Sequence, residues 1–190
     1  MVRHVLRLNE DLSQFYAMVE EDPALSWAAR GAGRMVRSPT LFEDIVKTVC
    51  TTNCAWSATE RSICWRWRVR PPAGTVDLEA LGRAAPEALS DDDVAARLIA
   101  LPVVGPYAAQ IMLLMGRYSR IIYDSWTRPT YARLTSGRAV KEATIRRRFG
   151  RYGRYAGLAF WLFLTQHWGT RDSAWPPERE AAPPERARDR

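Results

Sequence analysis

The chain is poor in the residues that hold metals or form disulfide frameworks. It has three cysteines and two histidines in 190 residues. Cys50, Cys54 and Cys64 have no fourth partner downstream, which excludes a four-cysteine zinc site or iron–sulfur cluster, and their odd number argues against a secreted disulfide framework. His4 and His167 are isolated in the sequence. We therefore expect no metal site made from side chains and a reducing, cytoplasmic location.

Long apolar runs are also absent. No uninterrupted stretch approaches the roughly 20 apolar residues that span a bilayer, and the N-terminus lacks the apolar core of a signal peptide. The hydrophobic content of 47% still provides enough apolar side chains for a buried core. These features predict a soluble protein without membrane association, made of one domain or two closely packed subdomains.

Lysine is scarce, so the positive charge is carried by arginine. Only Lys47 and Lys141 are lysines among 28 basic residues, and the formal net charge is +7. This charge favours an anionic partner, either nucleic acid or an acidic membrane surface. Planar guanidinium groups suit bidentate phosphate contacts, although an arginine-biased genome produces the same composition.

Apolar residues recur with the 3.6-residue period of helices, and no segment alternates with the period of a strand. Ser38 and Pro39 indicate a helix start, and Ser90 with Asp93 resembles a capping box. A short helix is also expected after Asp77. The predicted helical segments are 9–22, 25–30, 38–56, 56–70, 90–101, 106–117, 125–134, 141–148 and 152–168. The sequence therefore predicts an all-α fold.

The segment LPVVGPYAA, residues 101–109, joins two of these helices. Gly105 allows a sharp turn and a close approach to another molecule, and Pro106 suits the first position of the following helix. The unpaired N–H groups of that helix N-terminus can bind a phosphate. A plain turn between two helices explains the segment equally well.

This segment resembles the hairpin of the helix-hairpin-helix (HhH-GPD) superfamily of DNA glycosylases, which has the pattern Leu-Pro-Gly-Val-Gly. The superfamily places a catalytic aspartate about 20 residues beyond the hairpin glycine, and Asp124 in IIYDSW lies 19 residues after Gly105. Residues 38–56 and 149–163 are similar to further helices of that superfamily. The resemblance covers roughly residues 5–168 and is closest to the 8-oxoguanine and 3-methyladenine glycosylases without an iron–sulfur cluster.

The resemblance implies a compact all-α glycosylase domain over residues 1–172, with two helical subdomains flanking a cleft and the hairpin at about 92–117. Residues 173–190 are expected to form a disordered tail, because they contain Pro, Glu, Arg and Ala and almost no large apolar residue. The implied partner is double-stranded DNA with a damaged base, in a bacterium at the nucleoid, with no obligate protein partner evident. The implied DNA-binding residues are Asn53, Val104, Gly105, Tyr107 and Ala108.

Asp124 is the implied catalytic residue, a carboxylate that stabilises positive charge on the sugar and orients water. The dipole of the helix beginning near Ser125 should help keep it ionised. Taken alone, however, an aspartate before a helix is more often an N-cap. No cofactor is implied except a monovalent cation at backbone carbonyls of the hairpin.

The hairpin departs from the superfamily pattern at two positions. Val103 replaces a glycine, and Tyr107 stands where bifunctional relatives carry the lysine that forms a Schiff base. A phenol cannot form that imine, so a monofunctional glycosylase without lyase activity is expected. Tyr107 and Trp126 are candidates for the base pocket, although both also fit ordinary packing.

Residues 65–68, Trp-Arg-Trp-Arg, interleave aromatic and basic side chains as single-strand binders do, but core packing with a solvated basic face explains them better. Two other functions remain open. A non-catalytic hairpin module would bind duplex DNA without needing Asp124, and a truncated, inactive glycosylase would keep the fold alone. A helical protein-interaction scaffold explains neither the hairpin nor Asp124.

Overall fold

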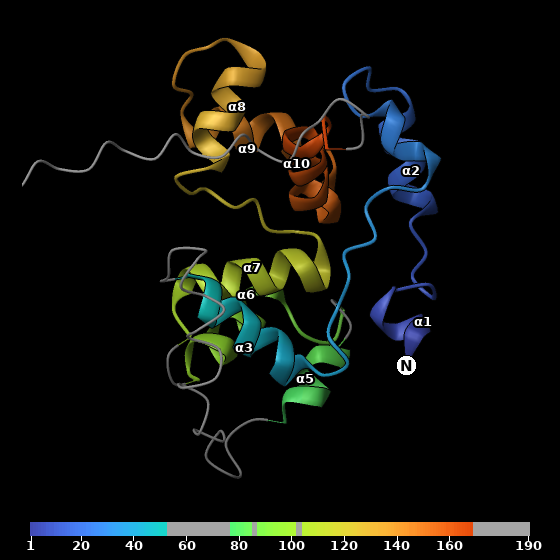
Figure 1. The fold of residues 1–190 in the computed structure, drawn as a ribbon, viewed down its shortest axis with the longest axis vertical. Helices are drawn as coiled ribbons and strands as arrows, with labels where there is room; N and C mark the ends of the chain where they lie inside the picture. The colour runs from blue at the N-terminus through green and yellow to red at the C-terminus, as the bar shows by residue number, and fades with distance from the viewer. Residues whose placement is uncertain (53–76, 85–86, 102–103, 169–190) are drawn as a thin grey trace, which may run out of the picture.

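A computed structural model describes residues 1–52, 77–84, 87–101 and 104–168 of the chain (Figure 1). All regular structure in these ranges is helical, which confirms the predicted all-α class. The predicted helix at 56–70 and the predicted tail at 173–190 lie outside the described residues. The elements are α1 (Val2–Val5), α2 (Ser13–Glu20), η1 (Ser26–Arg30), α3 (Leu41–Thr52), α5 (Leu78–Arg83), α6 (Asp91–Ile99), α7 (Pro106–Arg117), α8 (Thr127–Thr135), α9 (Glu142–Gly150), η2 (Gly153–Tyr155) and α10 (Ala156–Thr165).

The helices form two groups, each with its own core (Figure 1). In the first group α3, α5, α6 and α7 enclose an aliphatic core. It consists of Ile45, Leu81, Val94, Leu98, Leu101, Val104, Ala108, Ala109, Met112 and Leu113. In the second group α2, η1, α8, α9 and α10 surround a core rich in aromatic rings, with Phe15, Tyr131, Phe149, Tyr152, Tyr155, Phe160 and Phe163 among its members. The expectation of two helical subdomains is confirmed.

A cavity of about 620 Å³ lies between the two groups. Its lining comes from Tyr107 and Gln110 on α7, from the segment 119–123, and from Arg146 on α9. The expected cleft between the subdomains is therefore present.

Residues 118–120, which follow α7, pack tightly against the start of α10. The N–H of Leu158 donates to the carbonyl of Tyr118 at 2.9 Å. A Cβ on Gly157 would lie 2.3 Å from the carbonyl oxygen of Arg120, so only glycine permits this approach. The start of α10 thereby fixes the path of residues 118–120, which lead to Asp124.

Side chains from the N-terminal segment bind the other end of α7. Arg7 donates to the carbonyls of Met115 and Gly116, and Nη2 of Arg37 donates to Gly116 at 2.9 Å. These carbonyls at a helix C-terminus have no partner within the helix, and positive charge is favourable there. The two arginines therefore help to hold α7 against the second helical group.

The observed N-caps of the helices can be compared with those predicted from the sequence. The Ser90 hydroxyl accepts from the N–H of Asp93 at 3.1 Å, and Asp77 caps α5 through the N–H of Ala80, as predicted. The predicted start at Ser38 is wrong, because α3 begins at Leu41. The Thr40 hydroxyl accepts from the N–H of Glu43 at 3.2 Å, so the cap lies two residues later than expected. No helix within the described ranges is long and apolar enough to cross a membrane.

Candidate active site

The hairpin between α6 and α7 presents the N-terminus of α7. Gly105 is its N-cap, with φ −88° and ψ 172°, and Pro106 occupies the first helical position as predicted. This conformation is open to any residue, so the backbone angles at Gly105 do not themselves require glycine. A Cβ on Gly105 would have no atom within 4 Å, so the space beside it is open. The glycine keeps the surface beside α7 free of a side chain.

Gly105, Pro106 and Tyr107 are exposed at the start of α7. Val104 and Ala108 on either side are 5% and 2% exposed as whole residues and belong to the aliphatic core. Tyr107 and Ala108 are the second and third residues of α7, where N–H groups have no acceptor within an α-helix. The N–H of Val104 donates to the carbonyl of Leu101 at 3.3 Å. The N-terminus of α7 therefore offers the donors of Tyr107 and Ala108 to an anion.

Asp124 caps α8 and binds it through one carboxylate oxygen. Its Oδ1 accepts from the N–H of Trp126 at 2.8 Å and from the N–H of Thr127 at 2.7 Å. The N–H of Asp124 donates in return to Oγ1 of Thr127 at 2.9 Å. This reciprocal pair has the pattern of a capping box, with threonine at the third position. The two backbone donors and the helix dipole both interact favourably with a negative charge here.

The second oxygen of Asp124 meets the hairpin helix. The hydroxyl of Tyr107 donates to Oδ2 of Asp124 at 2.8 Å. Burial, together with the hydrogen bond to Asp124 and its negative charge, raises the pKa of Tyr107 to about 12. The phenol is therefore neutral at physiological pH and remains a donor. This contact joins the two sequence motifs, 17 residues apart, at one point in space.

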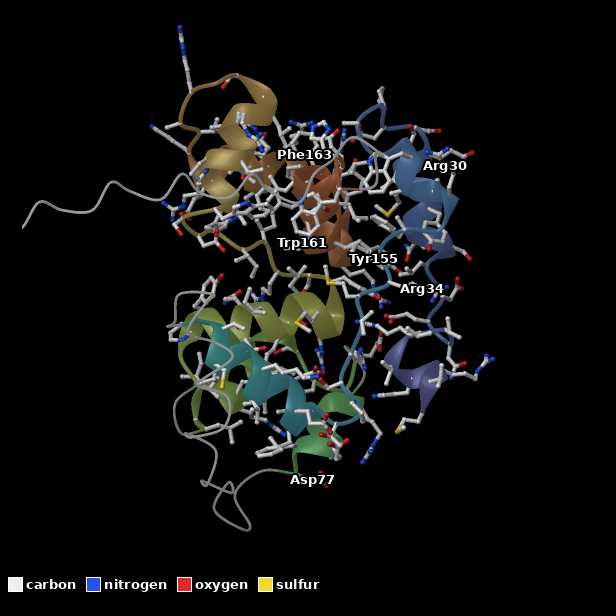
Figure 2. All side chains as sticks on the ribbon, in the orientation of Figure 1. Arg30, Arg34, Asp77, Tyr155, Trp161 and Phe163 are labelled. Atoms are coloured by element: carbon white, nitrogen blue, oxygen red, sulfur yellow. The ribbon has the colours of Figure 1, made fainter. Side chains whose placement is uncertain are left out.

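Trp126 belongs to a group of three tryptophans beside Asp124. Its ring centroid lies 5.7 Å from that of Trp161 on α10 and 6.0 Å from that of Trp168. Trp161 and Trp168 are 5.8 Å apart and nearly perpendicular. Figure 2 shows Trp161 and Phe163 on α10; Phe163 contacts the rings of Tyr131 and Phe149 instead. Trp126 and Trp168 are 37% and 50% exposed, so part of this aromatic group faces solvent.

A shallow hollow of about 350 Å³ lies at Asp124. Tyr123, Asp124, Ser125, Arg128 and Pro129 line it. Arg128, at the edge of this hollow, forms an ion pair with Glu142 of α9. A carboxylate, a cation and open solvent access thus occur together at the start of α8.

Some predicted site residues lie outside the described residues. They are Asn53, Val103 and the Trp-Arg-Trp-Arg segment 65–68. Within the described ranges no group of three or more His, Cys, Asp and Glu side chains is arranged to hold a metal ion. The expected monovalent cation would bind backbone carbonyls of the hairpin, of which residues 102 and 103 also lie outside these ranges.

Sequence reasoning missed Thr127, Trp161 and Trp168. The spacing of Asp124 and Thr127 contains a capping-box signal that a search for glutamate or glutamine at the third position overlooks. Trp161 lies in a helix that is apolar on almost every face, so its periodicity gives no sign of partial exposure. Its ring contact with Trp126 depends on how α8 packs against α10.

Comparisons with known proteins place this geometry in a known fold. No protein-family profile matches the sequence, and no curated protein matches it. Among solved structures, MBOgg1 in complex with a low-affinity DNA ligand matches with a TM-score of 0.61 and 16% identity, over 90% of this chain and 75% of that one. An 8-oxoguanine glycosylase/lyase of Clostridium acetobutylicum in complex with DNA matches with a TM-score of 0.58 and 17% identity, over 90% and 75% of the two chains.

A third match is the 3-methyladenine DNA-glycosylase of Archaeoglobus fulgidus, with a TM-score of 0.54 and 16% identity, over 88% of this chain and 74% of that one. The described part of the chain therefore has the helical fold of these DNA glycosylase structures. At this identity the likeness concerns the fold.

Proposed function

We propose that this protein is a DNA base-excision glycosylase that hydrolyses the N-glycosidic bond of a damaged base. The observation that carries the proposal is the contact of Tyr107 with Asp124 at 2.8 Å. It brings a carboxylate beside the N-terminus of the hairpin helix, which suits a DNA phosphate. A catalytic group and a backbone-binding group thus lie together in a chain with a DNA glycosylase fold.

DNA binding begins at the N-terminus of α7. The N–H groups of Tyr107 and Ala108 bind a phosphate, and the absent side chain of Gly105 lets the DNA backbone approach. The target nucleotide must leave the stack, because its glycosidic bond is inaccessible within the duplex. The solvent-exposed faces of Trp126 and Trp168 offer surfaces on which an extruded base can stack.

Asp124 acts on the sugar of the extruded nucleotide. As the C1′–N bond breaks, its electron pair leaves with the base and positive charge develops on the deoxyribose. The carboxylate stabilises this charge, and water forms the new C1′–O bond while losing a proton to the carboxylate or to solvent. The N–H groups of Trp126 and Thr127 donate to Oδ1 of Asp124. Oδ2 faces the substrate once the hydrogen bond from the Tyr107 hydroxyl is broken.

We infer that the enzyme lacks lyase activity through an imine at this site. Tyr107 lies beside Asp124, where a lyase needs an amine nucleophile. Its phenol, with a pKa of about 12, is neutral and forms no Schiff base. The expected product is an abasic site in an uncut strand.

A second candidate function is a non-catalytic DNA-binding module. It is favoured by one specific observation: both oxygens of Asp124 already have partners within the protein. In such a module Asp124 would serve only as a cap and as a brace for α7. A truncated, inactive glycosylase predicts the same behaviour.

Single-turnover incubation with duplexes that each carry one oxidised or alkylated base distinguishes these functions. Asp124→Asn is the matched variant, because an asparagine oxygen still caps α8. We expect strand cleavage only after alkali treatment, and a rate about 10²–10³-fold lower in the variant, the order of loss seen when a key electrostatic group is removed. Sodium borohydride should trap no covalent complex. Tight duplex binding without cleavage of any lesion by either protein would establish the binding module.

A further inference from the structure

Positive charge is concentrated on α8, α9 and the residues around them. Between residues 128 and 154 the sequence has nine basic side chains and one acidic side chain, Glu142. Between residues 77 and 99, which include α5 and α6, it has six acidic side chains and two basic ones. The two segments therefore differ in the sign of their net charge, and the segment of α8 and α9 is the positive one.

The fold itself uses several of these cations. Arg128 pairs with Glu142, and Arg151 pairs with Asp22. Three further guanidinium groups, those of Arg146, Arg148 and Arg154, interact with aromatic side chains. The other four basic side chains are exposed, and within the described ranges they form no ion pair: Arg133, Arg138, Lys141 and Arg147. We call these four the α8–α9 basic surface.

Lys141, one of the four, occupies a helix position that does not favour lysine. Lys141 is the N-cap of α9, a position that favours Ser, Thr, Asp or Asn, and its side chain caps nothing. A positive charge is also unfavourable at the positive end of the helix dipole. Helix formation therefore does not explain this cation, which suits an anionic partner.

The basic surface begins at the C-terminal end of α8, and the N-terminal end of this helix lies at the candidate active site. Arg128 lines the hollow at Asp124, and α8 leads from there to Arg133. The 9 residues of α8 span about 14 Å at 1.5 Å each. That length corresponds to about four nucleotides at 3.4 Å along one strand. The N-terminus of α7 belongs to the other helical group, and Tyr107 on it contacts Asp124.

We propose that the α8–α9 basic surface binds the phosphate backbone of duplex DNA, about four nucleotides from the extruded one. This inference rests on the proposed function, because it takes Asp124 as the position of that nucleotide. Duplex DNA fits better than an anionic membrane, since residues 135–139, Thr-Ser-Gly-Arg-Ala, offer no large apolar side chain to enter a bilayer. In Figure 2, side chains that end in nitrogen project from the segment that joins α8 and α9.

The test compares two triple variants with the same loss of charge. Arg133→Gln/Arg138→Gln/Arg147→Gln removes the proposed contact, and Arg3→Gln/Arg30→Gln/Arg83→Gln removes exposed arginines from α1, η1 and α5. The probe is a 20-base-pair duplex with a central tetrahydrofuran abasic-site analogue, and the readout is the Kd by fluorescence anisotropy at several salt concentrations. Thermal unfolding checks that each variant folds; single Arg138→Gln and Arg147→Gln variants replace the first triple if it does not.

We expect the first variant to bind about tenfold more weakly at 0.1 M salt. The slope of log Kd against log salt should fall by up to two or three, at about 0.9 for each phosphate that the variant no longer neutralises. The control should stay within twofold of wild type. Duplexes shortened by six base pairs on one side or the other add an independent readout. Wild type should lose affinity with one of the two truncations, and the first variant should be insensitive to that truncation.

Equal weakening of the two variants would show a general charge effect and overturn the inference, as would an unchanged first variant. Wild-type binding to vesicles of phosphatidylserine and phosphatidylcholine, with none to the duplex, would overturn both this inference and the proposed function. If no lesion is excised but the first variant still binds the duplex more weakly, the basic surface stands and the glycosylase proposal fails.

Discussion

The two helical groups bury chemically different cores and contribute differently to the candidate site. Among the described residues, the core of α3, α5, α6 and α7 contains no buried aromatic ring, whereas that of α2, α8, α9 and α10 combines aromatic rings with aliphatic side chains. The aliphatic group presents the N-terminus of α7, where Gly105 and Tyr107 are exposed. The segment before α8 presents the carboxylate of Asp124 and the ring of Trp126. In the proposed function the first group binds the DNA backbone and the second provides the reactive and stacking side chains.

The difference has a physical reason. Small and aliphatic residues let α6 and α7 pack closely; Ala108 and Ala109, which are 2% and 0% exposed, are examples. Aromatic rings fill larger volumes in the second core, and the rings of Trp126 and Trp161 pack together outside it, with Trp126 37% exposed. The candidate site forms where the two groups meet, at the contact of Tyr107 with Asp124.

We expect the largest effect from a substitution at Gly157, where α10 packs against the segment that connects the two helical groups. In Gly157→Ala the added Cβ would lie 2.3 Å from the carbonyl oxygen of Arg120, so the segment leading to Asp124 must move. We expect the free energy of unfolding to fall by about 1–3 kcal/mol. Glycosylase activity should fall at least tenfold more than the folded fraction explains, because small misplacements of a catalytic group are costly. Urea unfolding and single-turnover kinetics measure the two effects.

The matched control for this substitution is Gly116→Ala on α7, where an added Cβ has no atom within 4 Å. It should leave stability unchanged or raise it by up to about 1 kcal/mol, through the lower entropy of the unfolded chain. Equal losses in the two variants would show that the junction at Gly157 is not specially constrained.

Substitutions at two helix caps, one in each group, distinguish an effect on stability from an effect on activity. Ser90→Ala removes the cap of α6, and Thr127→Val removes the acceptor for the N–H of Asp124. Each should lower the free energy of unfolding by about 1 kcal/mol, the usual cost of removing a cap or a hydrogen bond. Activity should fall only in Thr127→Val, because only that cap positions Asp124. Loss of activity in Ser90→Ala at full folding would refute this division.

The smallest expected effect is a shift in a tyrosine titration. The folded-state pKa of Tyr107 is raised to about 12, so its hydrogen bond with Asp124 contributes to stability below about pH 10, and this contribution disappears as the pH rises through about 12. In Asp124→Asn the negative charge is gone, and one phenol should titrate closer to pH 10. Absorbance at 295 nm should show this phenol in Asp124→Asn and not in Asp124→Asn/Tyr107→Phe. An unchanged titration in Asp124→Asn would mean that burial alone raises the pKa.

The sequence predicted much of the helical framework but not the reasons for each of its features. Pro106 begins α7 and Ser90 caps α6, because local capping chemistry decides both. The predicted cap at Ser38 is wrong, since Thr40 offers its hydroxyl two residues later to the same helix. The dihedral angles of Gly105 are open to any residue, so the structure does not use the conformational freedom of glycine there; the space beside its Cα is open.

By itself, the sequence determined the all-α class, the two helices of the hairpin and the candidate residues Tyr107 and Asp124. The helical class and the two helices depend on interactions over a few positions, which periodicity and capping reveal. The candidates Tyr107 and Asp124 come from the resemblance of residues 101–109 and 121–126 to the glycosylase motif. Only the tertiary structure decided that Tyr107 donates to Asp124, that Trp161 lies beside Trp126, and that Gly157 fixes the segment between the groups. Such contacts join residues far apart in the chain, and they depend on how whole helices pack.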